Sequence, residues 1–180
     1  MYIAARHAET RVDAMQALIR SDPLGAIVRA GASGLEADHI PFELVPPTPE
    51  APHGLLRAHV ARANPLWRQD GAAVLVLFRG AAGYVSPLRH DLAAVGGRMV
   101  PTWDYAVVHA HGRLRTVEDG DWILAHMRRM TVRQEGERGW AVDDAPHDYI
   151  TQLLKATVGI EIAIEGLEAK TKRSAMHETS

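Results

Sequence analysis

The residue types best suited to chemistry gather in one stretch of this 180-residue chain, Leu55–Pro65, which reads LLRAHVARANP. Its alternation predicts a strand over Leu55–Ala61, with His59 on the more polar face. Arg62 follows the strand, and Asn64 stands before a proline, which is typical of a helix start with asparagine as the cap. Arginine and a helix N-terminus both suit a phosphate group. The residues alone leave two interpretations open, a phosphate site or a solvated strand face with a structural cap.

Two histidines, His109 and His111, are separated by one residue inside a predicted strand over Tyr105–Val117. This spacing places both imidazoles on one face, which a metal or haem site could use. A metal site would need further ligands that the pattern does not identify, and histidines also serve as hydrogen-bonding residues at sheet edges. Asp38 and His39 are adjacent on a strand and therefore point to opposite faces, so the carboxylate is poorly placed to orient the imidazole.

Composition narrows the function classes. The absence of cysteine excludes disulfides, thiolate catalysis and cysteine zinc sites. The net charge of −2 gives no basic footprint for nucleic acid. No Gly-rich phosphate loop or serine nucleophile elbow is recognisable. The N-terminal residues lack an apolar signal segment, and no apolar stretch has the length of a membrane span, so we expect a cytoplasmic protein without membrane contact.

Periodicity predicts a mainly β, α+β chain with a helix near the start and helices towards the end. Residues 1–180 are expected to form a single domain with a helical portion over about 118–158 and a mobile tail over about 174–180. The tail from Thr171 is polar and lacks periodicity, so its last residues are expected to be mobile. Pro41 indicates an edge strand or a bulge. The expected helices are Thr10–Arg20, Asp119–Gln134 and one opening at Asp144–Pro146 and ending near Gly159; the expected strands are Leu24–Arg29, Leu35–Leu44, Leu55–Ala61, Ala73–Phe78, Tyr105–Val117 and Ile160–Glu165.

Five stretches, taken in order and spacing, resemble the PaiB-like family of FMN-binding negative transcriptional regulators. The most specific are HVARANP and VPTWDYAVVHAHG. The resemblance covers nearly the whole chain. The stretches are Met1–Ile3, Gly34–Phe42, Leu56–Trp67, Val100–Gly112 and residues 146–162.

The resemblance implies an FMN-binding split β-barrel that forms a homodimer, with FMN in a cleft at the subunit interface. Arg62 and Asn64 would contact the phosphate and ribityl chain. The other contacts that the resemblance implies come from three further strands and the C-terminal motif. They are Asp38, His39, His59 and Ala61 from one subunit, Pro101, Thr102, Trp103 and Tyr105 from the other, and Lys170 and Lys172 in the C-terminal motif.

Three functions stay open at this point. The first is a regulator-type FMN-binding protein, in which a DNA partner follows only from family analogy. The second is an FMN-dependent oxidoreductase or flavin reductase on the same fold, because one fold hosts several flavin activities. The third, a haem- or metal-binding relative, would use His109 or His111.

Overall fold

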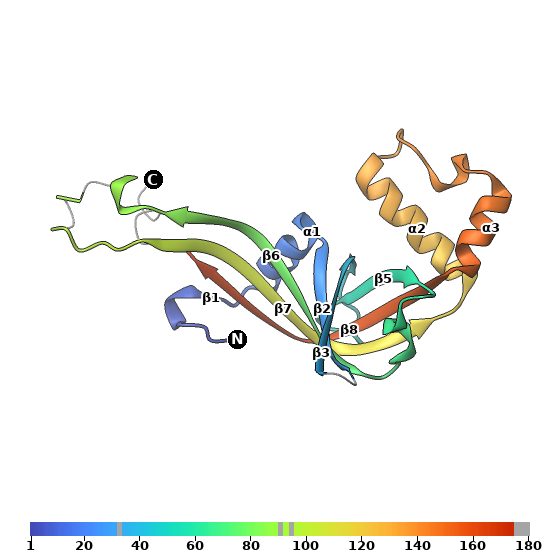
Figure 1. Ribbon diagram of the computed structural model, residues 1–180, viewed down its shortest axis with the longest axis horizontal. Coiled ribbons are helices and arrows are strands. Elements are labelled where there is room, and N and C mark those ends of the chain that lie inside the picture. The colour runs from blue at the N-terminus through green and yellow to red at the C-terminus, as the bar shows by residue number, and fades with distance from the viewer. Residues whose placement is uncertain (32–33, 90–91, 94–95, 175–180) are drawn as a thin grey trace.

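The computed structural model describes residues 1–31, 34–89, 92–93 and 96–174. Eight strands form one antiparallel sheet in the order β3-β2-β6-β7-β8-β5-β4, with β1 paired to β8 (Figure 1). The strands are β1 Ala8–Glu9, β2 Leu24–Gly31, β3 Gly34–Pro41, β4 Glu43–Val45, β5 Leu55–Ala61, β6 Ala73–Val85, β7 Thr102–Val117 and β8 Thr157–Lys172. The helices are α1 Val12–Ser21, α2 Gly120–Glu135 and α3 His147–Lys155, with short 3-10 turns η1 Ala5–His7, η2 Pro65–Arg68, η3 Pro87–Arg89 and η4 Val142–Asp144.

The barrel core is built from the alternating apolar positions of the strands. Inward-facing aliphatic residues of β5 and β8, such as Leu56 and Ile162, are fully buried, as the period of two requires. Phe42 and Phe78 meet edge to face with ring centroids 5.8 Å apart. Ile19 brings α1 into the same cluster. This closed cluster fixes the register of the strands that carry the polar side chains.

The paired ends of β6 and β7 leave the barrel as a long hairpin, whose described residues 80–89, 92–93 and 96–105 we call the arm (Figure 1). The register between the two strands shifts between Arg79 and Ala82, which marks a β-bulge. A bulge bends a strand and increases its twist. The arm therefore projects from the barrel at the end opposite α2 and α3 (Figure 1).

Helices α2 and α3 form a second, smaller apolar cluster beside β5 and β8. Its buried members are Ile123, Met127, Val142 and Ile150. Asp119 caps α2, because its Oδ1 atom accepts the backbone N–H groups of residues 121 and 122 at 2.8 and 3.1 Å. None of the described helices is long and apolar enough to cross a membrane.

The predicted mainly β class with an early helix and late helices is confirmed, and all late helices lie within 118–158. Pro41 does lie on an edge strand, β3. The predicted strand Ile160–Glu165 is longer in the structure, because β8 runs on to Lys172 by pairing with Tyr105 and Ala106 of β7. The last helix ends at Lys155 rather than near Gly159, since Thr157 already begins β8.

Two other predicted boundaries also change. The predicted strand Leu35–Leu44 is divided into β3 and β4, because Phe42 interrupts the ladder. Of the predicted mobile tail 174–180, only Ser174 is described, and its backbone N–H donates to Asp104 Oδ1 at 2.7 Å. Residues 175–180 lie outside the described part of the chain.

Candidate functional site

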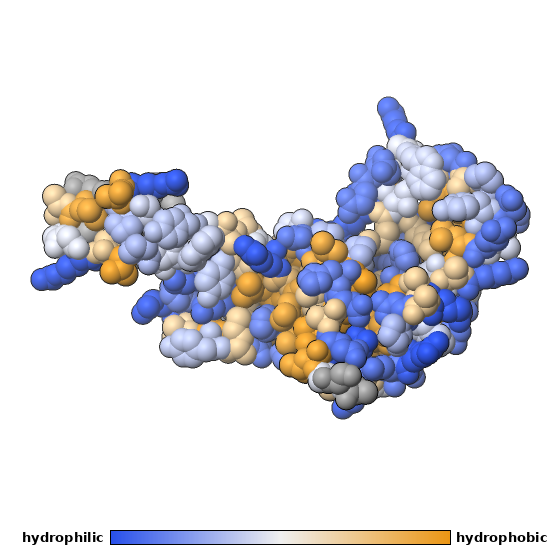
Figure 2. Space-filling model, in the orientation of Figure 1, coloured by the Kyte–Doolittle hydropathy of each residue, from blue (hydrophilic) through white to orange (hydrophobic). Residues whose placement is uncertain are grey.

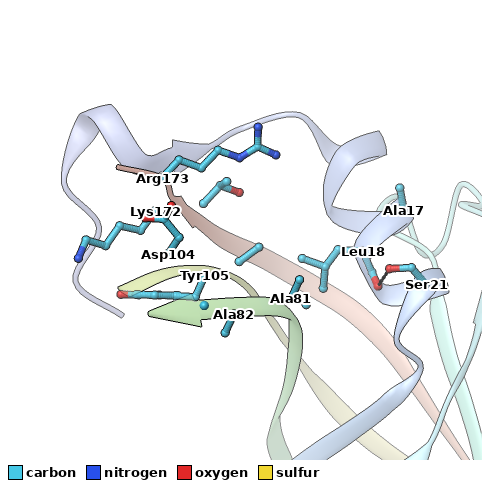
Figure 3. Close-up of a pocket in the computed structure, with 13 residues that line it drawn as sticks. Ala17, Leu18, Ser21, Ala81, Ala82, Asp104, Tyr105, Lys172 and Arg173 are labelled. Carbon is cyan, nitrogen blue, oxygen red and sulfur yellow. Dashed lines mark hydrogen bonds between the residues drawn. The ribbon is translucent and has the colours of Figure 1, made fainter. Parts of the chain in front are cut away.

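An open groove of about 880 Å³ lies where α1, β6, β7 and the end of β8 meet (Figure 3). Its walls are helix α1 on one side and the end of β8 on the other, and strands β6 and β7 form its floor. The volume falls in the range of small-molecule and cofactor sites. The lining residues are Ala17, Leu18, Ser21, residues 80–83, residues 104–106 and residues 171–173.

The floor of the groove is a run of four small residues, Gly80-Ala81-Ala82-Gly83, at the bulge of β6. A Cβ atom added at Gly83 would meet nothing within 4 Å, so the backbone there faces open space. Glycine in a strand often marks a bulge or a place where a ligand approaches the backbone closely. This floor therefore leaves open backbone surface at Gly83 that a planar group can approach.

Cationic and aromatic side chains stand at the β8 end of the groove. Lys172 Nζ donates to Thr102 Oγ1, which ties β8 to the start of β7. Arg173 is exposed and extends over the groove towards α1 (Figure 3). Lys170 Nζ lies 5.5 Å from the ring centroid of Tyr105, and the same ring lines the groove. This end therefore presents two lining cations, Lys172 and Arg173, beside an aromatic ring, and the Asp104 carboxylate in the same lining accepts hydrogen bonds from Ser174.

Asp38 and Asn64, both predicted cofactor contacts, lie together outside this groove. Asn64 Nδ2 donates to Asp38 Oδ1 at 2.9 Å, and Asn64 Oδ1 accepts the N–H of Leu66 at 2.9 Å. The predicted cap is confirmed, although it opens a 3-10 turn of four residues. Arg29, whose side chain is 3% exposed, holds Asp38 Oδ2 at 2.8 Å. His39 is exposed on the other face of β3.

Arg62 is held by contacts within its own chain, although its side chain is 39% exposed. Its Nε atom donates to the carbonyl of Lys155 at 2.9 Å, and its Nη1 atom lies 2.6 Å from Glu118 Oε2. Its guanidinium also lies over the Trp67 ring at 5.5 Å. These contacts attach the end of β5 to the end of α3 and to the residue that follows β7.

His59 and Ala61 line a different cavity, between β5 and the helices α2 and α3. The imidazole of His59 faces His126, with ring centroids 5.3 Å apart. Burial, with the nearby charge of His126 as a smaller cause, lowers the pKa of His59 to about 4. His59 is therefore neutral at physiological pH.

The structure thus divides the predicted site residues among separate places. Thr102, Tyr105, Lys170 and Lys172 converge beside the groove, while Pro101 and Trp103 are exposed nearby on the arm. Sequence reasoning missed the glycine-alanine floor, the α1 wall and Arg173. The floor did have a signal, because four small residues interrupt an apolar strand pattern.

The two strand histidines have ordinary surroundings. His111 Nε2 lies 3.1 Å from Glu168 Oε1, and the N-terminal ammonium of Met1 lies 3.1 Å from the other oxygen of the same carboxylate. Burial is the largest cause of a lowered pKa at His109. Over the described residues, no group of three or more histidine, aspartate or glutamate side chains is arranged to hold a metal ion.

Residues 1–166 match the protein-family profile described as "Putative FMN-binding domain". The chain belongs to this family of FMN-binding domains. An uncharacterised protein of Aspergillus fumigatus is 33% identical over 97% of this chain and 85% of its own length. The "Protease synthase and sporulation protein PAI 2" of Bacillus subtilis is 27% identical over 97% of this chain and 82% of its own length.

Solved structures agree on the fold. An FAD- and haem-binding protein of Mycobacterium smegmatis superposes with a TM-score of 0.68 over 93% of this chain and 74% of that chain, at 17% identity. The flavocytochrome Anf3 of Azotobacter vinelandii gives a TM-score of 0.69 over 96% of this chain and 73% of that chain, at 11% identity. The fold is therefore the split β-barrel of FMN- and FAD-binding proteins, as the sequence resemblance predicted.

Proposed function

We propose that this protein binds FMN in the groove between α1, β6 and the end of β8. The observation that carries the proposal is the position of the cations of Lys172 and Arg173 at one end of a groove with a floor of small residues. Family membership supports the choice of FMN. A bound flavin would supply redox chemistry, while the chain would bind and orient it.

The groove suits the two ends of FMN differently. The phosphate needs cationic donors, which Lys172 and Arg173 offer, because charge-assisted hydrogen bonds to phosphate are the strong ones. The isoalloxazine ring needs an open surface to pack against, which the small residues Ala81, Ala82 and Gly83 offer beyond the Leu18 side chain that covers Gly80. The Tyr105 ring can pack against the flavin edge.

We also propose that the protein is a homodimer and that the second copy closes the groove. The groove is open on one side, and the arm beside it exposes large apolar side chains that a monomer would leave in water. Under this proposal, four of the predicted contacts that do not line the groove in one chain would reach the flavin of the other copy. These four are Asp38, His39, Arg62 and Asn64.

A regulatory role, which the family resemblance suggests, would then act through flavin binding. The net charge of −2 supports this route over direct contact with DNA, since DNA-binding proteins neutralise phosphates with a basic face.

The test is a titration of the full-length protein with FMN and with riboflavin, which lacks the phosphate. We expect saturable quenching of flavin fluorescence with FMN. Lys172→Ala should weaken FMN binding by about tenfold while changing riboflavin binding little, because the lysine acts on the phosphate. Lys155→Ala, an exposed lysine on α3 outside the groove, is the matched control and should bind FMN like the unmodified protein.

Two results would contradict the proposal. The first is an absorption spectrum of FMN that does not change on addition of excess protein. The second is an equal loss of FMN and riboflavin affinity in Lys172→Ala, which would place the lysine away from the phosphate.

A further inference from the structure

A second pocket of about 520 Å³ opens between β5, α2 and α3, at the end of the molecule opposite the arm. No lysine, arginine, aspartate or glutamate belongs to its lining. An uncharged wall of this kind disfavours a charged ligand, because a buried charge without a partner is costly. The lining residues are His59, Ala61, Met127, Met130, Thr131, Trp140, Val142, Tyr149, Ile150, Leu153, Ala156 and Thr157.

His59 supplies a polar group of this wall, in addition to the hydroxyl groups of Thr131, Tyr149 and Thr157. Its Nδ1 atom is buried and has no hydrogen-bond partner among the residues that the structure describes. The Nε2 atom of the adjoining His126 is buried and has no partner among the described residues either, so Nδ1 of His59 is closed off beside that ring, and the other ring nitrogen of His59, Nε2, is the one left for a ligand in the pocket. The adjoining Thr157 hydroxyl is already committed, because it donates to the carbonyl of Leu153 at 2.8 Å.

The imidazole of His59 is held in place by a stack of rings behind it. His126 meets His59 edge to face, and His126 stacks on Trp122 at 5.4 Å with an interplanar angle of 23°. His126 Nδ1 is fixed in turn by Glu43 Oε2 at 2.9 Å. A polar group this well positioned can select a ligand by a directed hydrogen bond.

The mouth and floor of the pocket suit an aromatic ring. Trp140 and Tyr149 border it and are 52% and 57% exposed, which is unusual for side chains of this size. Met127 and Met130 lie along α2, and thioether groups adapt to and attract aromatic rings.

We propose that this pocket binds an uncharged, planar aromatic molecule of one or two rings, whose hydroxyl or N–H group forms a hydrogen bond with the imidazole of His59. The site is separate from the proposed flavin groove, because it offers no cation for the FMN phosphate. The inference does not depend on flavin binding.

The experiment compares three probes by NMR titration of the full-length protein at neutral pH. The probes are 2-naphthol, naphthalene and 2-naphthoate. We expect saturable binding of 2-naphthol, affinity about three- to tenfold lower for naphthalene, which lacks the hydrogen bond, and no saturable binding of the anionic 2-naphthoate.

Three variants locate the site. His59→Phe keeps a ring but removes both nitrogens, and it should lower 2-naphthol affinity to that of naphthalene while leaving naphthalene binding unchanged. His111→Phe removes an exposed strand imidazole outside the pocket and should bind all probes like the unmodified protein. Thr131→Trp fills the pocket from α2 and should abolish binding. Circular dichroism and the thermal midpoint confirm that each variant is folded.

The proposal is overturned if the unmodified protein binds no probe saturably, if 2-naphthoate binds as tightly as 2-naphthol, or if folded Thr131→Trp still binds. An equal loss of affinity for 2-naphthol and for naphthalene in His59→Phe would also overturn the assigned hydrogen bond. Displacement of 2-naphthol by FMN would show that the pocket belongs to the flavin site. FMN binding itself is measured separately, so failure here leaves the proposed function intact.

Discussion

At the scale of single residues, the buried imidazole of His59 makes stability depend on pH. Burial lowers its pKa from the ordinary 6.5 to about 4, so the unfolded chain takes up a proton first as pH falls. The contribution of His59 to the free energy of unfolding is therefore lost as pH drops from 6.5 towards 4 and is fully present above 6.5. Between pH 7 and pH 5 this amounts to about 2 kcal/mol of unfolding free energy.

Urea unfolding of the unmodified protein and of His59→Phe at these two pH values measures the effect. The loss on acidification should be about 2 kcal/mol smaller in the variant. Glu43 interferes little at pH 5: burial alone would raise its pKa, but hydrogen bonds from His126 and Arg129 lower it to about 2. Equal losses in the two proteins would refute the assignment to His59.

The contacts of an individual residue were predictable from sequence where its partners lie nearby in the chain. The Asn64 cap depends on a backbone N–H two residues away, so sequence spacing was enough. The partners of Arg62 come from residues 118, 155 and 157, which only the fold brings to the end of β5. For the same reason, the contact of His59 with His126, on a helix distant in sequence, was not predictable.

At the scale of elements, the bulge between β7 and β8 requires a glycine. The register shifts between His111 and Gly112, and a Cβ atom on Gly112 would collide with the carbonyl oxygen of Ala163. Backbone cannot move aside as a flexible side chain can, so Gly112→Ala should reduce the free energy of unfolding by about 2–3 kcal/mol.

Gly166→Ala is the matched control, because Gly166 pairs with His111 across the same bulge and an added Cβ there meets nothing within 4 Å. Its stability in urea should stay within about 0.5 kcal/mol of the unmodified protein. If Gly112→Ala and Gly166→Ala lower the free energy of unfolding equally, the loss comes from replacing glycine in these strands and not from a collision between residue 112 and the carbonyl oxygen of Ala163.

Helix α2 was predicted within one residue at each end, because its cap and its apolar spacing are both local signals. Strand β6 was predicted to stop at Phe78, where the apolar run ends. It continues through small residues to Val85 because β7 pairs with it from Ala82 onward. The groove depends on that extension, so its position could not be predicted from the apolar pattern of β6 alone.

At the scale of the whole molecule, the resemblance predicted the split barrel, but the projection of the arm depends on pairing between distant strands. Figure 2 shows apolar side chains gathered towards the end of the arm, where Leu88 and Val100 are 87% and 74% exposed. Trp103 packs edge to face on Tyr84 with centroids 5.8 Å apart and still remains 53% exposed. Surface of this kind is typical of an interface.

If a second copy covers the arm, Trp103 is a central contact, because buried tryptophans dominate interface energies. Light scattering should then give twice the chain mass of 19.7 kDa, and Trp103→Ser should raise the dimer dissociation constant by at least about tenfold. FMN affinity should fall in the same variant, since the groove would lose the wall that the second copy supplies. Trp140→Ser removes a tryptophan of nearly equal exposure, 52%, from the opposite end and should remain dimeric. A monomer at every concentration, or equal behaviour of the two variants, would mean that the exposed arm serves another purpose and that the groove must hold its flavin within a single chain.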